Sequence, residues 1–300
     1  MKPTVFIHTN HKQYIGALVS AHSMRRNSRD PDAFDVKLIE LKDHMDVFGQ
    51  YEGREYLRDG TSRRWLNDDL QSFTPLRFMP PELMGYQGKA VVVDPDVFAV
   101  QDVNELLNRD MEGKAVACCT RGAGPRKHPA SSVMLMDCAK LTHWKVSEDF
   151  DALFRREREY KTWMNLGYDD PATIGVLEPE WNDFDKLSER TKMIHNTRRK
   201  TQPWKSGLPV DFVPSENNPY SPISWVNFLR RKLFGEYGLL GSYRDHPDVN
   251  QQNLFFGLLR ECVENGTITE PILRDAMKEN WVRHDAFEIM ERTPPLAKAA

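Results

Sequence analysis

The chain carries few of the features that mark secreted, membrane-spanning or nucleic-acid-binding proteins. It has 4 cysteines among 300 residues. Two of them, Cys118 and Cys119, adjoin in an apolar run, which is typical of reduced core thiols rather than of a disulfide framework or a zinc site. No apolar run reaches the roughly 20 residues that a membrane-spanning helix needs. A net charge of −3 lacks the basic surplus of a dedicated nucleic-acid-binding protein.

Two short signals are also missing near the beginning of the chain. No apolar signal-peptide segment precedes the first predicted strand, residues 4–8, so we expect a cytoplasmic protein. No glycine lies between that strand and Gly16. A nucleotidyltransferase with an α/β sheet would need a glycine-rich phosphate loop there, so the sequence favours this class of enzyme least.

What the sequence does contain is an alternation of apolar strands and amphipathic helices. Strands are predicted at residues 4–8, 35–41, 90–96, 113–120, 131–138 and 191–195. A helix is predicted over residues 12–26, helical stretches within the polar segment 43–70, and a helical region from about residue 222 onward. This rhythm predicts an α/β protein with a mostly parallel sheet flanked by helices.

The most informative segment is the run from Ala90 to Val93, which ends in Asp94-Pro95-Asp96. The apolar run predicts a buried strand, and Pro95 predicts its end because proline has no backbone N–H. Two carboxylates at the end of a buried strand are costly unless a cation compensates their charge, and carboxylate oxygens suit Mg²⁺ or Mn²⁺. The alternative is an acidic turn without a ligand, since Asp-Pro-Asp is also a good turn sequence.

Five segments, in order, resemble motifs of glycosyltransferase family 8, the glycogenin and bacterial galactosyltransferase-like group. They are the first strand with its helix YIGALVSAHSMRRNS, then FTPLRFMPPELMGYQGKAVVVDPDVFAVQDVNELL, SSVMLMDCAKL, LEPEWNDFD and MIHNTRRKTQPWKSG. The resemblance covers about residues 3–207. It implies a GT-A fold, a Rossmann-like mixed, mostly parallel sheet flanked by helices. Residues 1–207 would form the nucleotide-sugar-binding and catalytic domain, and residues 208–300 a helical region packed on it at the acceptor side.

The resemblance also implies roles for individual residues. Asp94, Asp96 and His195 would hold Mn²⁺ or Mg²⁺. The residues expected to bind the nucleotide-sugar donor are Thr9, Asn10, Tyr14, Arg77, Lys200 and Lys205. Taken alone, His195 is more simply an ordinary histidine at a strand end, and Arg77 could equally be a surface arginine. The basic segment around Lys200 is by itself typical of a solvated loop.

The chain departs from the family pattern at several positions. Gln202 stands where the family has a lysine before Pro-Trp, and Ala130-Ser131-Ser132 replaces Asn-Ser-Gly. No Asp-Gln-Asp motif precedes the Trp181-Asn182 turn, although that motif lies near the reacting sugar in the family. The catalytic candidates that remain in this part of the chain are Asn165, Asp169 and Asp170.

Together these features predict a metal-dependent glycosyltransferase that moves a hexose from a nucleoside-diphosphate sugar to a hydroxyl acceptor. By resemblance the donor is UDP-linked and the anomeric configuration is retained. The alternative is a non-catalytic protein of the same fold that binds a nucleotide sugar or a protein partner. The missing motif favours this alternative, and the three metal-binding residues oppose it. The acceptor could be a glycan, a lipid or a protein, and the sequence leaves a homodimer open.

Overall fold

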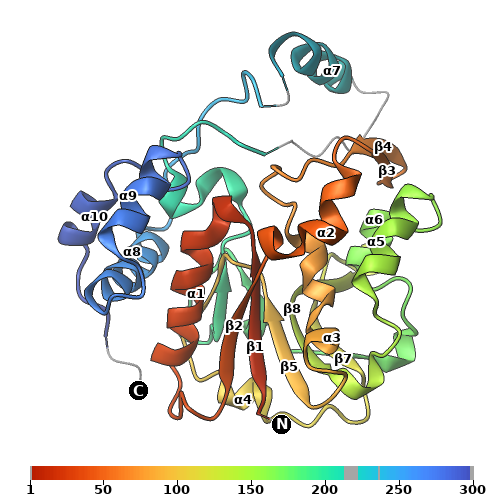
Figure 1. Cartoon of the computed structure of the whole chain (residues 1–300). Helices are drawn as coiled ribbons and strands as arrows, with labels where there is room; N and C mark the ends of the chain where they lie inside the picture. The colour runs from red at the N-terminus through yellow and green to blue at the C-terminus, as the bar shows by residue number, and fades with distance from the viewer. Residues whose placement is uncertain (1, 213–221, 236, 298–300) are drawn as a thin grey trace.

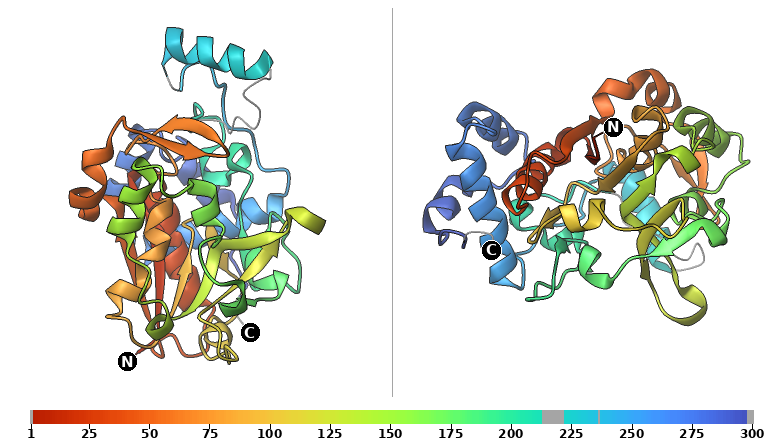
Figure 2. Two further views of the ribbon diagram at one scale, coloured as in Figure 1. Left: turned by 90° about the vertical axis from the view of Figure 1, so that its right-hand side faces the viewer. Right: turned by 90° about the horizontal axis from the view of Figure 1, so that it is seen from below.

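The structure, a computed structural model, describes residues 2–212, 222–235 and 237–297 (Figures 1 and 2). Its strands are β1 (Thr4–Thr9), β2 (Asp35–Glu40), β3 (Glu55–Arg58), β4 (Thr61–Arg64), β5 (Lys89–Val93), β6 (Val97–Ala99), β7 (Val116–Arg121), β8 (His128–Asp137), β9 (Ile174–Val176), β10 (Asp183–Phe184) and β11 (Met193–His195). Its α-helices are α1 (Tyr14–Arg26), α2 (Met45–Phe48), α3 (Pro80–Leu83), α4 (Asn104–Leu107), α5 (Val146–Phe154), α6 (Tyr160–Met164), α7 (Pro222–Phe234), α8 (Val249–Glu264), α9 (Glu270–Lys278) and α10 (Ala286–Arg292).

The main sheet has six strands in the order β2-β1-β5-β8-β7-β9. β1 runs parallel to β2 and β5, and β7 runs parallel to β9. Only β8 breaks the pattern among these strands, because it is antiparallel to both β5 and β7. The fold class predicted from the sequence, a mixed and mostly parallel sheet flanked by helices, is therefore confirmed.

Helices cover both faces of this sheet, because successive side chains of a strand point to opposite faces. Val5, Ile7 and Val91 pack on the face covered by α1 and α4. Phe6 and Val92 pack on the other face, against an aromatic-rich core beneath α2, α3, α5 and α6 (Figure 1). Burial on both faces explains why the central strands read as continuous apolar runs rather than as alternating ones.

The helices α8, α9 and α10 form a further layer outside α1 (Figure 1). Ile15 and Val19 of α1 share one core with Phe255 and Leu259 of α8, and Trp204 joins it. The predicted helical character of the C-terminal region is thus confirmed for the described residues, while the domain boundary at residue 207 stays a prediction. None of the helices in the described ranges is long and apolar enough to cross a membrane.

The prediction for residues 43–70 is wrong in its second half. α2 is helical, but residues 55–64 form the antiparallel hairpin β3–β4. Its two turn residues, Asp59 and Gly60, have φ of 54° and 70°. An Asp-Gly pair with both φ values positive is the preferred two-residue hairpin turn. This dipeptide was the signal in the sequence, and the polar, basic strands around it concealed the hairpin.

Candidate metal centre and adjoining cavity

The two carboxylates of the Asp-x-Asp segment lie in a tight turn between β5 and β6. β5 ends at Val93, and Val97 N–H donates to the carbonyl of Asp94 at 3.1 Å, which closes the turn. α1 packs closely against this turn. A Cβ atom on Gly16 would lie only 2.9 Å from the carbonyl oxygen of Pro95. A glycine at this position of α1 therefore lets the helix approach the turn.

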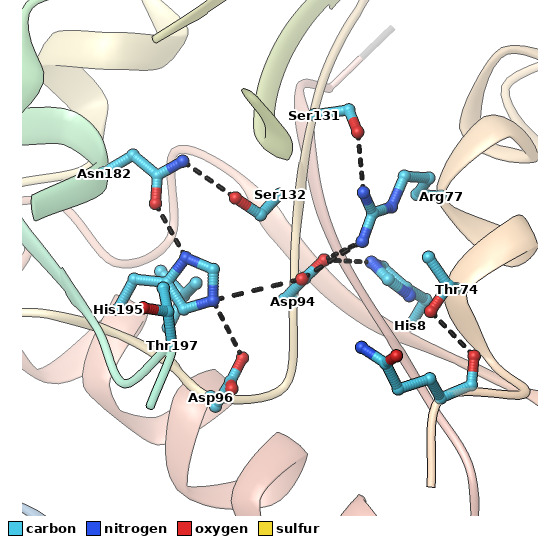
Figure 3. A network of polar contacts seen from close by, with 12 residues as sticks. His8, Thr74, Arg77, Asp94, Asp96, Ser131, Ser132, Asn182, His195 and Thr197 are labelled. Carbon is cyan, nitrogen blue, oxygen red and sulfur yellow. Dashed lines mark hydrogen bonds and ion pairs between the residues drawn. The ribbon is translucent and has the colours of Figure 1, made fainter. Parts of the chain in front are cut away.

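His195 reaches the carboxylates through strand pairing. β11 is antiparallel to β6, with His195 opposite Val97, and Asn196 N–H donates to the carbonyl of Asp96 at 3.1 Å. The imidazole Nε2 lies 3.3 Å from Asp96 Oδ1 and 4.0 Å from Asp94 Oδ2 (Figure 3). Ligand atoms of Asp94, Asp96 and His195 all lie within 4.8 Å of one another, so these three residues could hold a metal ion.

The second nitrogen of His195 is fixed by Asn182, which lies on the 3₁₀ turn Pro179–Asn182. His195 Nδ1 lies 2.9 Å from Asn182 Oδ1, and the Asn182 amide donates to Ser132 Oγ at 2.9 Å (Figure 3). Because the amide oxygen can only accept, Nδ1 carries a proton, and the ring is held with Nε2 toward the carboxylates. A hydrogen bond of this kind is the usual support for a metal-binding histidine.

One oxygen of each carboxylate is occupied by neighbouring side chains. Asp94 Oδ1 accepts hydrogen bonds from His8 Nε2 and Arg77 Nη2, both at 2.8 Å (Figure 3). Asp96 Oδ2 accepts one from Gln202 Nε2 at 3.0 Å. The oxygens that face His195 are therefore Asp94 Oδ2 and Asp96 Oδ1, although Arg77 Nη2 also lies 3.1 Å from the former. Two carboxylate oxygens and one imidazole nitrogen are a suitable donor set for Mn²⁺ or Mg²⁺.

The charges around Asp94 keep it ionised. Burial alone raises the pKa of the Asp94 carboxyl, but the Arg77 charge and the His8 hydrogen bond outweigh this effect, so its pKa lies below its ordinary value. Burial lowers the pKa of His8, whose side chain is fully enclosed. Neutral His8 thus donates its Nε2–H to the carboxylate. Burial also acts to lower the pKa of His195, but Asp96 and Asp94 raise it above its ordinary value overall.

Sequence reasoning missed His8 and Gln202 as partners of the carboxylates. The signal for His8 was the order of the strands. β1 and β5 are parallel neighbours with Ile7 beside Val93, so the next residues, His8 and Asp94, lie side by side. For Gln202 the sequence showed only the absence of the expected lysine.

A cavity of about 200 Å³ adjoins the three metal-site residues. Its lining includes Arg77, Arg121, Ser131, Asn165 and Arg199. Arg77 also donates to Ser131 Oγ at 2.6 Å, so its two amino groups join η4 (Thr74–Phe78) to β8 and to the turn that follows β5. A cavity that combines carboxylates, arginines and neutral polar groups is chemically suited to a metal-bound diphosphate and the sugar attached to it.

Of the residues predicted to bind the nucleotide-sugar donor, Arg77 lines this cavity. Asn10 caps the 3₁₀ turn His11–Gln13 through its side-chain oxygen and donates to Ser72 Oγ at 3.0 Å. Lys205 is fully buried and pairs with Asp211 at 2.7 Å. The predicted donor-binding residues that are absent from the described lining of this cavity are Thr9, Asn10, Tyr14, Lys200 and Lys205. The basic segment contributes Arg199 instead, and the donor-binding roles stay predictions.

The three catalytic candidates have separate surroundings. Asn165 follows α6 and lines the cavity. Asp169 accepts hydrogen bonds from Trp144 Nε1 at 2.8 Å and His143 Nε2 at 2.9 Å. Asp170 caps the 3₁₀ turn Pro171–Thr173. Asn165 is therefore the candidate that the structure brings to the metal centre, and the two aspartates already have structural partners.

Comparison with solved structures finds glycosyltransferases. The WbbM bifunctional glycosyltransferase matches 68% of this chain at 14% identity with a TM-score of 0.45, and the match spans 47% of that protein, about half its length. The galactosyltransferase LgtC, in complex with donor and acceptor sugar analogues, matches 67% of this chain and 89% of its own at 12% identity, TM-score 0.47. The glycosyltransferase GlyE of Streptococcus pneumoniae TIGR4 matches 89% of this chain and 64% of its own at 14% identity, TM-score 0.49.

The similarity concerns the fold and carries no residue roles. No profile of a known protein family matches the sequence. No curated protein sequence matches it either. The function must therefore be argued from the site.

Proposed function

We propose that the protein is a metal-dependent glycosyltransferase. It transfers a hexose from a nucleoside-diphosphate sugar to a hydroxyl group of an acceptor. The UDP-linked donor and the retained anomeric configuration come from the family resemblance. The observation that carries the proposal is the arrangement of Asp94, Asp96 and His195, in which each carboxylate turns one oxygen toward the imidazole nitrogen.

The residues divide the work as follows. Asp94, Asp96 and His195 would hold Mn²⁺ or Mg²⁺, and the bound ion would stabilise the negative charge of the departing nucleoside diphosphate. Arg77 and His8 hold Asp94 in place, and Asn182 orients His195. Arg199 supplies positive charge at the cavity wall. The polar side chains of Ser131 and Asn165 line the remaining space and would contact the donor sugar.

The proposal is tested by ligand binding on three forms of the protein. UDP, GDP and CMP sugars are added with and without Mn²⁺ to the wild type, to Asp96→Ala and to the matched control Asp32→Ala, whose side chain is exposed at the surface. We expect one nucleotide class to raise the melting temperature only with Mn²⁺, in the wild type and in Asp32→Ala. If no nucleotide sugar shifts it, or if Asp96→Ala shifts equally, the proposal is overturned.

A non-catalytic nucleotide-sugar-binding protein is the second candidate. The occupation of Asp169 by Trp144 and His143, together with the missing Asp-Gln-Asp motif, favours it. The two functions differ in the fate of the donor. A transferase slowly releases UDP from the sugar nucleotide in water without an acceptor, and a binding protein releases none. Measuring free UDP over hours with the Mn²⁺-loaded protein separates them, with Asp96→Ala as the control.

A further inference from the structure

A second, larger cavity of about 530 Å³ lies next to the one at the metal centre. Gln71 and Arg199 line both cavities, so the two are contiguous. We call the second cavity the basic cleft. Its lining cations come from three distant parts of the chain, namely Arg58, Arg63 and Arg64 of the β3–β4 hairpin, Arg199, and Arg231 and Lys232 of α7. Figure 1 places both the hairpin and α7 at the end of the molecule opposite the N-terminus.

The charge of the basic cleft is opposite in sign to that of the whole chain. Six cationic side chains and two carboxylates, Glu55 and Asp69, line it, whereas the chain carries a net charge of −3. Glu55 also bonds to Ser62 Oγ at 2.8 Å across the hairpin. A local cationic excess in a concave site raises the concentration of anions there.

Two of these arginines are packed on aromatic rings rather than on carboxylates. The Arg58 guanidinium lies 4.8 Å from the centre of the Tyr160 ring, and that of Arg199 lies 5.4 Å from the Phe212 ring. Within the described residues, no carboxylate lies within ion-pair distance of either arginine. Burial lowers the pKa of Arg199, and the nearby charge of Arg58 lowers it further. Burial acts to lower the pKa of Arg58, but Tyr160 and Tyr56 raise it overall. It is therefore Arg199 that lies partly buried beside a like charge, which is unfavourable until an anion joins it.

From this arrangement we propose that the basic cleft binds a phosphate or carboxylate group carried by the acceptor. This inference rests on the proposed glycosyltransferase function and names the acceptor class. The donor diphosphate belongs beside the metal ligands, and none of these lines the basic cleft. The cleft volume lies within the roughly 300–1,000 Å³ typical of small-molecule sites. An anionic group held there would place the rest of the acceptor toward Arg199 and the metal centre.

The test is a calorimetric titration of the full chain saturated with UDP and Mn²⁺. The probes are methyl glucoside, glucose 6-phosphate and glucuronate, so that a neutral sugar, a phosphate and a carboxylate are compared. We expect at least one anionic sugar to bind about tenfold or more tightly than methyl glucoside, since charge-assisted hydrogen bonds to arginine are strong. Arg58→Gln and Arg64→Gln should each reduce this preference about fivefold or more, and Arg292→Gln, on α10, should leave it unchanged.

The outcomes separate this inference from the proposed function. Equal binding of neutral and anionic sugars, or a preference that survives both cleft substitutions, overturns the inference while UDP binding still supports the function. Weaker UDP binding in Arg58→Gln also overturns it, because the arginine would then serve the donor. Failure of UDP and Mn²⁺ to bind the wild type overturns the function itself. Arg64 is exposed, so Arg64→Gln provides the test even if Arg58→Gln does not fold.

Discussion

The two adjoining cavities differ in whether their charged side chains have partners of opposite charge within the chain. At the metal centre, Asp94 is held by Arg77 and His8, so a buried anion and a buried cation compensate each other within the chain. In the basic cleft, Arg58 lies near enough to Arg199 to lower its pKa, and neither arginine has a carboxylate at ion-pair distance among the described residues. The first arrangement preorganises Asp94 Oδ2, one of the two carboxylate oxygens that face His195, before any ion binds. The second leaves charge to be compensated by a ligand, so the two cavities should respond differently when one of their charges is removed.

The largest effect on stability should come from breaking the ion pair between Arg77 and Asp94. Arg77→Met leaves Asp94 buried without its guanidinium partner, and we expect the unfolding free energy without metal to fall by about 3–5 kcal/mol. Urea unfolding measures this. Arg292→Met is the control, because Arg292 is 80% exposed and its ion pair with Glu288 should contribute little. A loss below about 1 kcal/mol for Arg77→Met would show that the pair is not a stabilising element of the metal centre.

A smaller effect should come from releasing the histidine. Asn182→Ala removes the acceptor for His195 Nδ1, so the ring is no longer held with Nε2 toward the carboxylates. We expect Mn²⁺ affinity, titrated in the presence of UDP, to fall about 10- to 100-fold. Asn182→Asp keeps an acceptor oxygen and should recover most of the affinity. The exposed Asn108→Ala is the control, and equal affinities in the two alanine variants would contradict the orienting role.

A cluster outside both cavities joins one carboxylate to an arginine and a histidine, and its loss should have an effect of intermediate size. Glu261 of α8 accepts from Arg26 at 2.7 Å and from His22 at 2.8 Å on α1. Burial raises the pKa of Glu261, but these two partners lower it below the ordinary 4.5 overall. A lowered folded-state pKa means that the stabilisation is complete above pH 4.5 and disappears as the pH falls through the folded-state value.

Glu261→Gln should therefore cost about 1 kcal/mol at pH 7 and progressively less in acid. Melting temperatures of the wild type and the variant, followed from pH 7 downward, measure this. The two curves should converge below pH 4.5. A constant difference across the whole range would mean that the charge of Glu261 is not what joins α8 to α1.

The smallest effect should come from the basic cleft. Arg58→Gln removes a cation that repels Arg199, at the cost of its contact with the Tyr160 ring. We expect these effects to offset each other, leaving the unfolding free energy within about 0.5 kcal/mol of the wild type. Urea unfolding in a buffer without phosphate measures it. A loss as large as that of Arg77→Met would mean that the arginine is a structural element, and the contrast between the cavities would disappear.

The sequence predicted the parts of the site that depend on local pattern. The strand end at Pro95, the paired carboxylates and His195 in a late strand could all be identified from residue types in order. His8 could not, because its place beside Asp94 depends on which strands are neighbours in the sheet. Gln202 reaches Asp96 from a loop more than a hundred residues away in the chain, and no local pattern encodes that contact.

The basic cleft was hidden for a related reason. Its cations lie in a hairpin, a loop after β11 and α7, and each group alone is an ordinary charged segment. The net charge of the chain did not indicate the basic cleft, because acidic residues elsewhere cancel the positive charge of its side chains. The hairpin, which carries three of the six cations, could have been predicted from Asp59-Gly60.

α1 is in contact with both the carboxylate turn and α8. Gly16 lies against Pro95, while Ile15 and Val19, its neighbours on the helix, lie in the core shared with Phe255. A protein truncated after residue 207 would therefore expose to water the apolar side of the same helix against which the metal-binding turn is packed. The C-terminal helices therefore support the metal centre through α1. A metal-binding assay on the first two thirds of the chain alone would not report the affinity of the whole protein.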